Sequence, residues 1–139
     1  HRLMRMHTCM HLLCSLVEGA ITGCSVGAEK GRVDFDLPES PDKAALDAGL
    51  NRLIEEDRLV SVSSISDAEL AARPDLVRSM SVKPPAGAGR VRLVEIDGAD
   101  LQPCGGTHVR ATGEIGRVRI GKVEKKGRLN RRINILFDD

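Results

Sequence analysis

Two short motifs, far apart in the chain, contain groups that bind metal ions and would have to meet in the folded protein. The first motif is HTCMH at residues 7–11, and the second is CGGTH at residues 104–108. On a helix, residues four apart lie one above the other at about 6 Å, which lets two imidazoles bind one ion. Three imidazoles and one thiolate are a complete tetrahedral set for zinc. The pattern therefore predicts a zinc site made by His7, His11, Cys104 and His108.

Each motif also has an interpretation without metal. The first would be a pair of packed or solvated helix histidines, but the main apolar stripe lies on the opposite side of the predicted helix. The second would be a Gly-Gly turn between strands, which does not explain its flanking Cys and His. Cys14 shares the histidine face and competes as the thiolate, and Cys104 is preferred because its pairing with His108 would otherwise be unexplained. We expect Cys9 and Cys24 to be small apolar fillers.

The chemistry of the predicted zinc site is left open by its ligand number. One thiolate and three neutral imidazoles leave the ion a net charge near +1. This charge favours a role as a Lewis acid or in substrate orientation over a purely structural role. Four protein ligands close the coordination shell, whereas catalytic zinc usually keeps one position open. Either one ligand is loose, or the ion expands its coordination, or it positions the substrate.

Composition places limits on the fold and on the location of the protein. The 139 residues fit one domain, 1–139, and with no Trp or Tyr and only two Phe its core must be aliphatic. Four cysteines at irregular spacing beside histidines fit the reducing cytoplasm better than a disulfide framework. No apolar run is long enough to span a membrane. Because the chain starts at His1 rather than Met, we expect that a segment upstream is absent from it.

The order of predicted elements indicates an α+β fold, a mainly antiparallel sheet with helices packed on it and the zinc site between the first helix and the Gly-Gly turn. Three helices are predicted. The first covers 3–20, the second is capped by Ser40 and ends near Asp57, and the third is short and begins with a capping box at 66–69. Predicted strands cover 21–26, 31–36, 59–65 and 91–96, and a hairpin of 115–124 and 129–137 turns at 125–127. The clearest loop is 83–89.

Charge is unevenly distributed although the net charge is only +1. Acids dominate 34–57, and bases dominate 110–132. The basic stretch could meet phosphates, but from charge alone we favour a solvated hairpin with alternating charges. Asp34 and Asp36 are assigned to the solvent face of a strand rather than to an acid/base dyad. No Walker or dinucleotide pattern is present, so a nucleotide cofactor is not expected.

The chain resembles the editing domain of alanyl-tRNA synthetase and its free-standing relatives, the alanyl-tRNA editing proteins. HTCMHLL at 7–13 is similar to the family's first zinc motif, and GAEKGRVDF at 27–35 to its next characteristic stretch. DLQPCGGTHV at 100–109, followed by TGEIG at 112–116, is similar to its most specific signature. The threonyl-tRNA synthetase editing domain shares both ligand pairs but usually lacks the Gly-Gly-Thr spacer, so the alanyl side is favoured.

The resemblance implies hydrolysis of the ester that joins a wrong amino acid, serine first and glycine second, to the 3′ end of the alanine tRNA. It carries over His7, His11, Cys104 and His108 as zinc ligands, position for position. It also implies tRNA as the partner. Family members often carry a domain before the zinc helix that helps to read the tRNA, and none is visible in this chain.

Four other residues are candidates for the substrate side of the site. The resemblance implies that Gln102 and Thr107 support the zinc ligands or contact the substrate. A hydroxyl near Thr22 or Ser25 could recognise the serine side chain. The alternative is that each is a surface residue without a role in substrate binding. A site built to hydrogen-bond serine's hydroxyl can reject alanine, because alanine would leave buried polar groups unpaired.

Two rival functions stay open beside the editing hydrolase. The first is a non-catalytic zinc module that binds tRNA or a synthetase partner. The closed ligand set and the expected absence of an upstream segment both favour it somewhat. A threonyl-type editing domain is the other. Within the alanyl family, the wording of residues 22–38 is closer to the free-standing proteins, which edit in trans.

Overall fold

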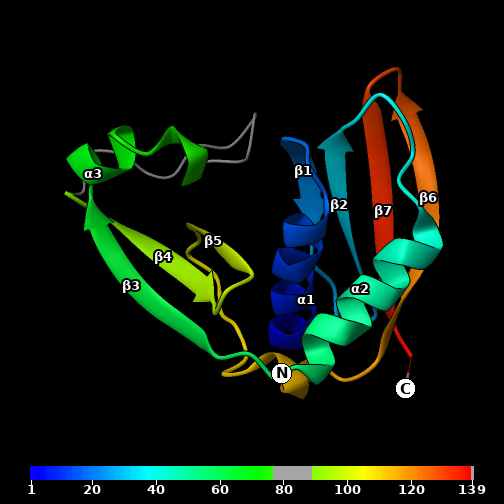
Figure 1. The fold of residues 1–139 in the computed structure, drawn as a ribbon, viewed down its shortest axis with the longest axis horizontal. Coiled ribbons are helices and arrows are strands. Elements are labelled where there is room, and N and C mark those ends of the chain that lie inside the picture. The colour runs from blue at the N-terminus through cyan, green and yellow to red at the C-terminus, as the bar shows by residue number, and fades with distance from the viewer. Residues whose placement is uncertain (77–88, 139) are drawn as a thin grey trace.

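The strands form two antiparallel sheets in this computed structural model, which describes residues 1–76 and 89–138 (Figure 1). The larger sheet has the strand order β1-β2-β7-β6, and the smaller has the order β3-β4-β5. The strands are β1 (Ile21–Ser25), β2 (Lys30–Asp36), β3 (Val60–Ser66), β4 (Arg90–Ile96), β5 (Asp100–Pro103), β6 (Val118–Gly127) and β7 (Asn130–Phe137). The α+β class and the antiparallel pairing are confirmed, but the strands divide into two sheets where one was expected.

Helix α1 (Arg2–Leu16) stands between the two sheets (Figure 1). It ends short of the predicted Ala20 because Val17 takes an extended conformation. The histidine face of the helix is not a solvent face, since His11 is only 5% exposed while Leu13 on the opposite side is fully buried. A helix with neighbours on several sides needs no solvent face. It packs closely on β2 at Gly31, where any Cβ would lie 2.8 Å from Met6.

Helix α2 (Lys43–Glu55) packs against the edge strand β6. Its N-cap is Asp42, whose carboxylate accepts hydrogen bonds from two backbone N–H groups, so the prediction of Ser40 as the cap is wrong by two positions. The Asn51 side chain pairs with both the N–H and the C=O of Val118, and the Asp47 carboxylate accepts from the N–H of Ile120. Side chains of α2 thereby cover part of an edge that would otherwise invite another strand.

Strand β2 lies inside the larger sheet and is buried on both faces. Val33 and Phe35 join the aliphatic core with α1 and β7. Asp34, expected on a solvent face, is instead buried, and its carboxylate accepts hydrogen bonds from Arg32 and Arg132. The prediction failed because alternation identifies two faces but does not reveal that guanidinium groups cover the polar one.

The remaining boundaries shift by a few residues. The capping box at Ser66 is confirmed and opens α3 (Asp67–Ala71). Residues Thr112–Ile115 form a 3₁₀ turn, so β6 starts later than predicted, and the hairpin turns at 128–129 because Lys125 still pairs with Arg131.

The predicted loop at 83–89 falls almost entirely outside the described residues. Among the described helices, none is long and apolar enough to cross a membrane.

Candidate metal centre

The two sequence motifs meet in the folded chain. Helix α1 supplies His7 and His11, and the turn that follows β5 supplies Cys104 and His108. One ligand atom from each of these residues lies within 4.8 Å of every other, an arrangement that could hold a metal ion. His11 is buried and the other three are half-buried, so the cluster extends from the protein interior to the solvent-exposed surface.

The spacing of the four side chains fits a small tetrahedral ion. The Cys104 Sγ lies 3.6 Å from Nε2 of His7 and 3.5 Å from Nε2 of His108. The rings of His7 and His108 stack at 4.2 Å between centroids, and His11 meets both of them edge-on. Ligands held about 2.0–2.3 Å from a tetrahedral zinc lie roughly 3.5 Å from one another. The two distances from the Cys104 Sγ have this length, and the whole group, within 4.8 Å, could hold a metal ion.

Two of the imidazoles are oriented by an acceptor behind them. Nδ1 of His7 lies 3.2 Å from the carbonyl oxygen of Thr107. Nδ1 of His108 lies 3.0 Å from the hydroxyl of Thr8, which itself donates to the carbonyl of Met4 and accepts from the N–H of Val109. Each Nδ1 is thereby assigned the proton, which leaves Nε2 as the metal-binding nitrogen. The buried Thr8 was not predicted, because nothing in the local pattern shows that its hydroxyl meets a residue of the second motif.

The four substrate-side candidates are placed unequally. Thr107 contributes its backbone carbonyl to His7 while its own side chain is exposed. The Gln102 amide donates to the carboxylate of Asp100, behind the cluster. The hydroxyl of Thr22 donates to Asn130 of β7, and Ser25 is exposed at the end of β1. Roles of these four in substrate binding stay predictions.

Arg92 of β4 holds the turn that carries Cys104. Its Nη1 donates to the carbonyls of Cys104 and Gly106, at 2.8 and 2.7 Å. The backbone carbonyl of Arg92 in turn accepts from the N–H of Cys104, which continues the β4–β5 pairing into the turn. A single guanidinium with several donors suits this clamp. Sequence reasoning missed Arg92, since one Arg in a strand carries no signal of such a partner.

Hydrogen bonds to the sulfur favour the thiolate form of Cys104. Burial alone raises the pKa of this thiol, but hydrogen bonds from His108, His11, His7 and the Gly106 N–H lower it to about 3. Burial lowers the pKa of His108, which favours the neutral, metal-binding imidazole. Burial also disfavours charge on His11, but Asp100 and Cys104 outweigh it and raise that pKa. A thiolate facing imidazoles is the form in which these groups bind metal.

In the metal-free protein, iodoacetamide should modify Cys104 almost as fast at about pH 5 as at about pH 8. With its pKa lowered to about 3, the thiol is ionised across this range, whereas the reactivity of an ordinary thiol of pKa about 8.5 falls about tenfold per pH unit. The measurement is the modification rate of the Cys104 peptide by mass spectrometry, in a Cys24→Ser background. Cys9 is a silent internal control, because burial raises its pKa to about 12. A tenfold loss of rate per unit would contradict the thiolate.

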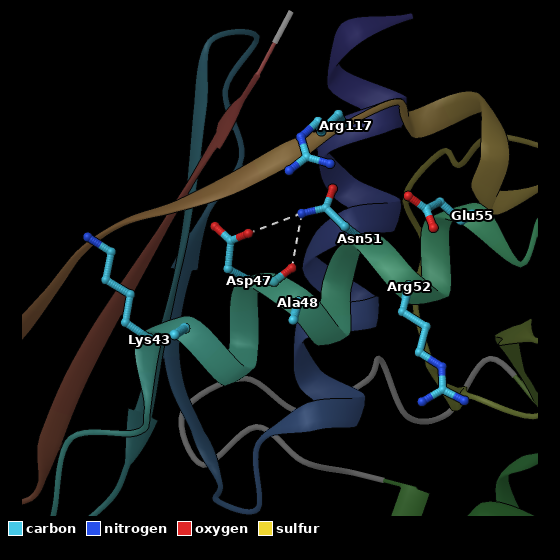
Figure 2. A pocket seen from close by; sticks show the side chains of 8 residues that line it. Lys43, Asp47, Ala48, Asn51, Arg52, Glu55 and Arg117 are labelled. Atoms are coloured by element: carbon cyan, nitrogen blue, oxygen red, sulfur yellow. Dashed lines mark hydrogen bonds between the residues drawn. The ribbon is translucent and has the colours of Figure 1, made fainter.

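An open groove of about 630 Å³ lies along α2 and is lined by charged and polar side chains, among them Lys43, Asp47, Asn51, Arg52 and Arg117 (Figure 2). None of the four clustered His and Cys residues lines it. Figure 2 shows Asp47 and Asn51 turned toward each other, and both also bond to β6. The groove is therefore separate from the candidate metal centre.

Part of the basic stretch pairs with acidic side chains within the fold. Arg117 and Arg119 pair with Asp138, and Lys126 pairs with Glu124. Arg132 pairs with Asp34, and the buried Arg131 donates to backbone carbonyls around the hairpin turn. Four of the nine bases in this stretch therefore have an acidic partner, and both interpretations of it, a solvated hairpin and a phosphate-binding surface, stay predictions.

Comparison with known proteins gives a consistent picture. Residues 91–134 match the family model of the threonyl and alanyl tRNA synthetase second additional domain. Alanyl-tRNA editing protein AlaX-M of Methanosarcina acetivorans is 37% identical over 140 residues, which are 96% of this chain and 57% of that protein. AlaX-M of Saccharolobus solfataricus is 33% identical over 96% of this chain and 58% of its own length. The alanine–tRNA ligase of Pyrobaculum aerophilum is 32% identical over 90% of this chain and 15% of the ligase.

The chain thus spans somewhat more than half the length of the AlaX-M proteins that it matches. Similarity over nearly all of the chain includes both ligand motifs, and the family model covers the second of them. Residues 91–134 therefore match the threonyl and alanyl tRNA synthetase second additional domain, and nearly the whole chain is similar to the alanyl-tRNA editing proteins.

Proposed function

We propose that this protein edits mischarged tRNA in trans, hydrolysing the ester that joins serine, and secondarily glycine, to the 3′ end of the alanine tRNA. The cluster of three imidazoles and one thiolate is the observation that carries the proposal. The names of its relatives, alanyl-tRNA editing proteins, support tRNA editing as the general activity. The reaction belongs in the cytoplasm, which also fits the four free cysteines.

The bond that breaks joins the amino-acid carbonyl carbon to the ribose oxygen. Water adds to that carbon, the ribose oxygen leaves with a proton, and the products are free serine and uncharged tRNA. An aminoacyl ester is already activated, so a positioned water and a polarised carbonyl suffice without a strong nucleophile. Zinc, when bound by His7, His11, Cys104 and His108, would supply Lewis-acid polarisation or substrate orientation. The half-buried His7 and His108 give the substrate an approach from solvent.

Selection of serine over alanine requires a polar partner for the serine hydroxyl. A buried polar group that alanine leaves unpaired can discriminate strongly, whereas a purely apolar pocket cannot. Thr22, Ser25, Gln102 and Thr107 are the candidates proposed from the sequence. Thr107 contacts the cluster directly, since its backbone carbonyl meets Nδ1 of His7. Gln102 is one residue further away, because it bonds Asp100 and Asp100 approaches His11.

The Gly-Gly turn offers a test of the zinc-binding geometry. A Cβ at Gly106 would overlap Cε1 of His7 and lie 2.7 Å from its Nδ1, whereas a Cβ at Gly105 would meet nothing within 4 Å. We expect Gly106→Ala to displace the His7 ring and to weaken zinc binding by on the order of 10–100-fold, with Gly105→Ala close to wild type. Titration of each metal-free protein with zinc against a chromophoric chelator measures the difference. Equal affinities of the two variants would contradict the geometry.

The function is tested by release of labelled serine from seryl-tRNA made on the alanine tRNA. Correctly charged alanyl-tRNA and seryl-tRNA made on the serine tRNA are the controls. Rapid release from the first substrate alone would establish a specific editing hydrolase. No release from a folded, zinc-loaded sample would favour the rival, a non-catalytic zinc module, once a version carrying the additional length of the AlaX-M relatives had also failed. Release from seryl-tRNA made on the threonine tRNA would instead favour the threonyl-type domain.

A further inference from the structure

Behind the cluster lies a buried carboxylate to which the proposed reaction assigns no role. Asp100 begins β5, and its Oδ2 lies 3.3 Å from Nδ1 of His11. Both side chains are almost fully buried, 6% exposed for Asp100 and 7% for His11. Their approach joins the edge of the smaller sheet to the middle of α1.

We propose that Asp100 is a positioning residue for the metal centre: its carboxylate accepts a hydrogen bond from the Nδ1–H of His11 and so holds Nε2 toward the metal. The inference rests on the proposed zinc site. In this structure the pair is close but not aligned, and within the described ranges Nδ1 of His11 has no hydrogen bond of acceptable geometry. A buried donor without a partner is costly, and a modest turn of the ring toward Asp100 would satisfy it.

A second residue holds the carboxylate in place. The Gln102 amide donates to the same Oδ2 of Asp100 at 2.7 Å. Residues two apart on a strand point to the same face, so the DLQ sequence of β5 presents both side chains together. Backbone pairing of β5 with β4 fixes the position of both residues along the sheet, with Asp100 opposite Ile96 and Gln102 opposite Val94. The carboxylate is therefore held from its own strand and is directed at the helix.

The three histidines differ in what stands behind them. His7 faces a backbone carbonyl and His108 faces a hydroxyl, whereas His11 faces a carboxylate. A carboxylate behind a metal-binding imidazole fixes its tautomer and makes it a stronger ligand. A buried carboxylate also needs a positively polarised partner, and a metal-bound imidazole that keeps its Nδ1 proton is one. With its ring turned onto Asp100, His11 would therefore have the strongest acceptor of the three histidines.

The test compares zinc affinity across three variants. Asp100→Leu removes the acceptor, Asp100→Asn keeps a weaker one, and Asp34→Asn alters a carboxylate that is equally buried but bonded to arginines of the other sheet. We expect zinc affinity, measured against a chromophoric chelator, to fall by on the order of 10–100-fold for Asp100→Leu and by less for Asp100→Asn. Asp34→Asn should leave the affinity unchanged. The visible spectrum of the Co²⁺-loaded protein should change for the Asp100 variants alone.

The outcomes separate this inference from the proposed function. If wild type and both Asp100 variants bind zinc equally, the role of Asp100 is overturned and the metal centre stands. If Asp34→Asn loses as much affinity as Asp100→Asn, the effect is general destabilisation and the inference fails. A wild-type chain that binds no zinc would overturn both. If Asp100→Leu does not fold by circular dichroism, the comparison of Asp100→Asn with Asp34→Asn decides.

Discussion

His108→Ala should abolish the proposed deacylase activity, by on the order of 10³-fold or more, while leaving a folded domain. The ring of His108 supplies an Nε2 next to Cys104 and stacks on His7, so its removal opens one corner of the ligand set. The side chain is only half-buried and is not part of the aliphatic core, so its loss leaves little unfilled space. Turnover of seryl-tRNA, zinc content and far-UV circular dichroism are measured on the same sample.

A matched control for this variant is His1→Ala. His1 is the one histidine outside the cluster, it is exposed, and its side chain makes no capping hydrogen bond to α1. His1→Ala should keep wild-type activity. Gross unfolding of His108→Ala would identify the metal as structural, because binding free energy would then be folding free energy. Full activity in a folded His108→Ala would remove the cluster from the reaction.

Phe35→Ala should destabilise the metal-free protein by about 3–5 kcal/mol. Phe35 is fully buried on β2, in a core that has only one other Phe and neither Trp nor Tyr. Removing the ring leaves a cavity that the surrounding aliphatic side chains cannot fill without moving. Because the protein lacks Trp and Tyr, urea unfolding is best followed by far-UV circular dichroism.

The control for this second variant is Phe35→Leu, which keeps most of the volume and should cost less than about 1.5 kcal/mol. A loss from Phe35→Ala no larger than that from Phe35→Leu would show that β2 can close around the vacancy. The slope of the unfolding free energy against urea should be unchanged in both, since a changed slope would report an altered denatured state rather than a cavity.

The features predicted correctly from the sequence are those that local chemistry specifies. A Ser followed three residues later by a Glu satisfies two helix N–H groups wherever it stands, and Ser66 does open α3. Alternation of polar and apolar residues located β2, and β4 followed from its apolar run. The meeting of His7, His11, Cys104 and His108 was predictable for a related reason, since His and Cys at a spacing of four have few other joint explanations.

The features that were missed depend on partners distant in the chain. Ser40 and Asp42 are both good caps, and the helix that packs on β6 begins after the second of them. Asp34 reads as a surface residue until Arg132 of β7 is brought beside it. Cys24, expected as a buried filler, is exposed because β1 forms the outer edge of its sheet, while Cys9 is buried as predicted.

The sequence by itself determined the ligand types, most strand and helix positions and the relationship to the editing proteins, because each depends on residue identity and short-range spacing. Only the tertiary structure decided how the ligands are held. Thr8, Arg92 and Asp100 each contact a residue of the metal cluster or its turn, from a different element. Such contacts arise when β4 pairs with β5 and when α1 packs against that sheet, and no local pattern encodes which hydroxyl, guanidinium or carboxylate then supports the cluster.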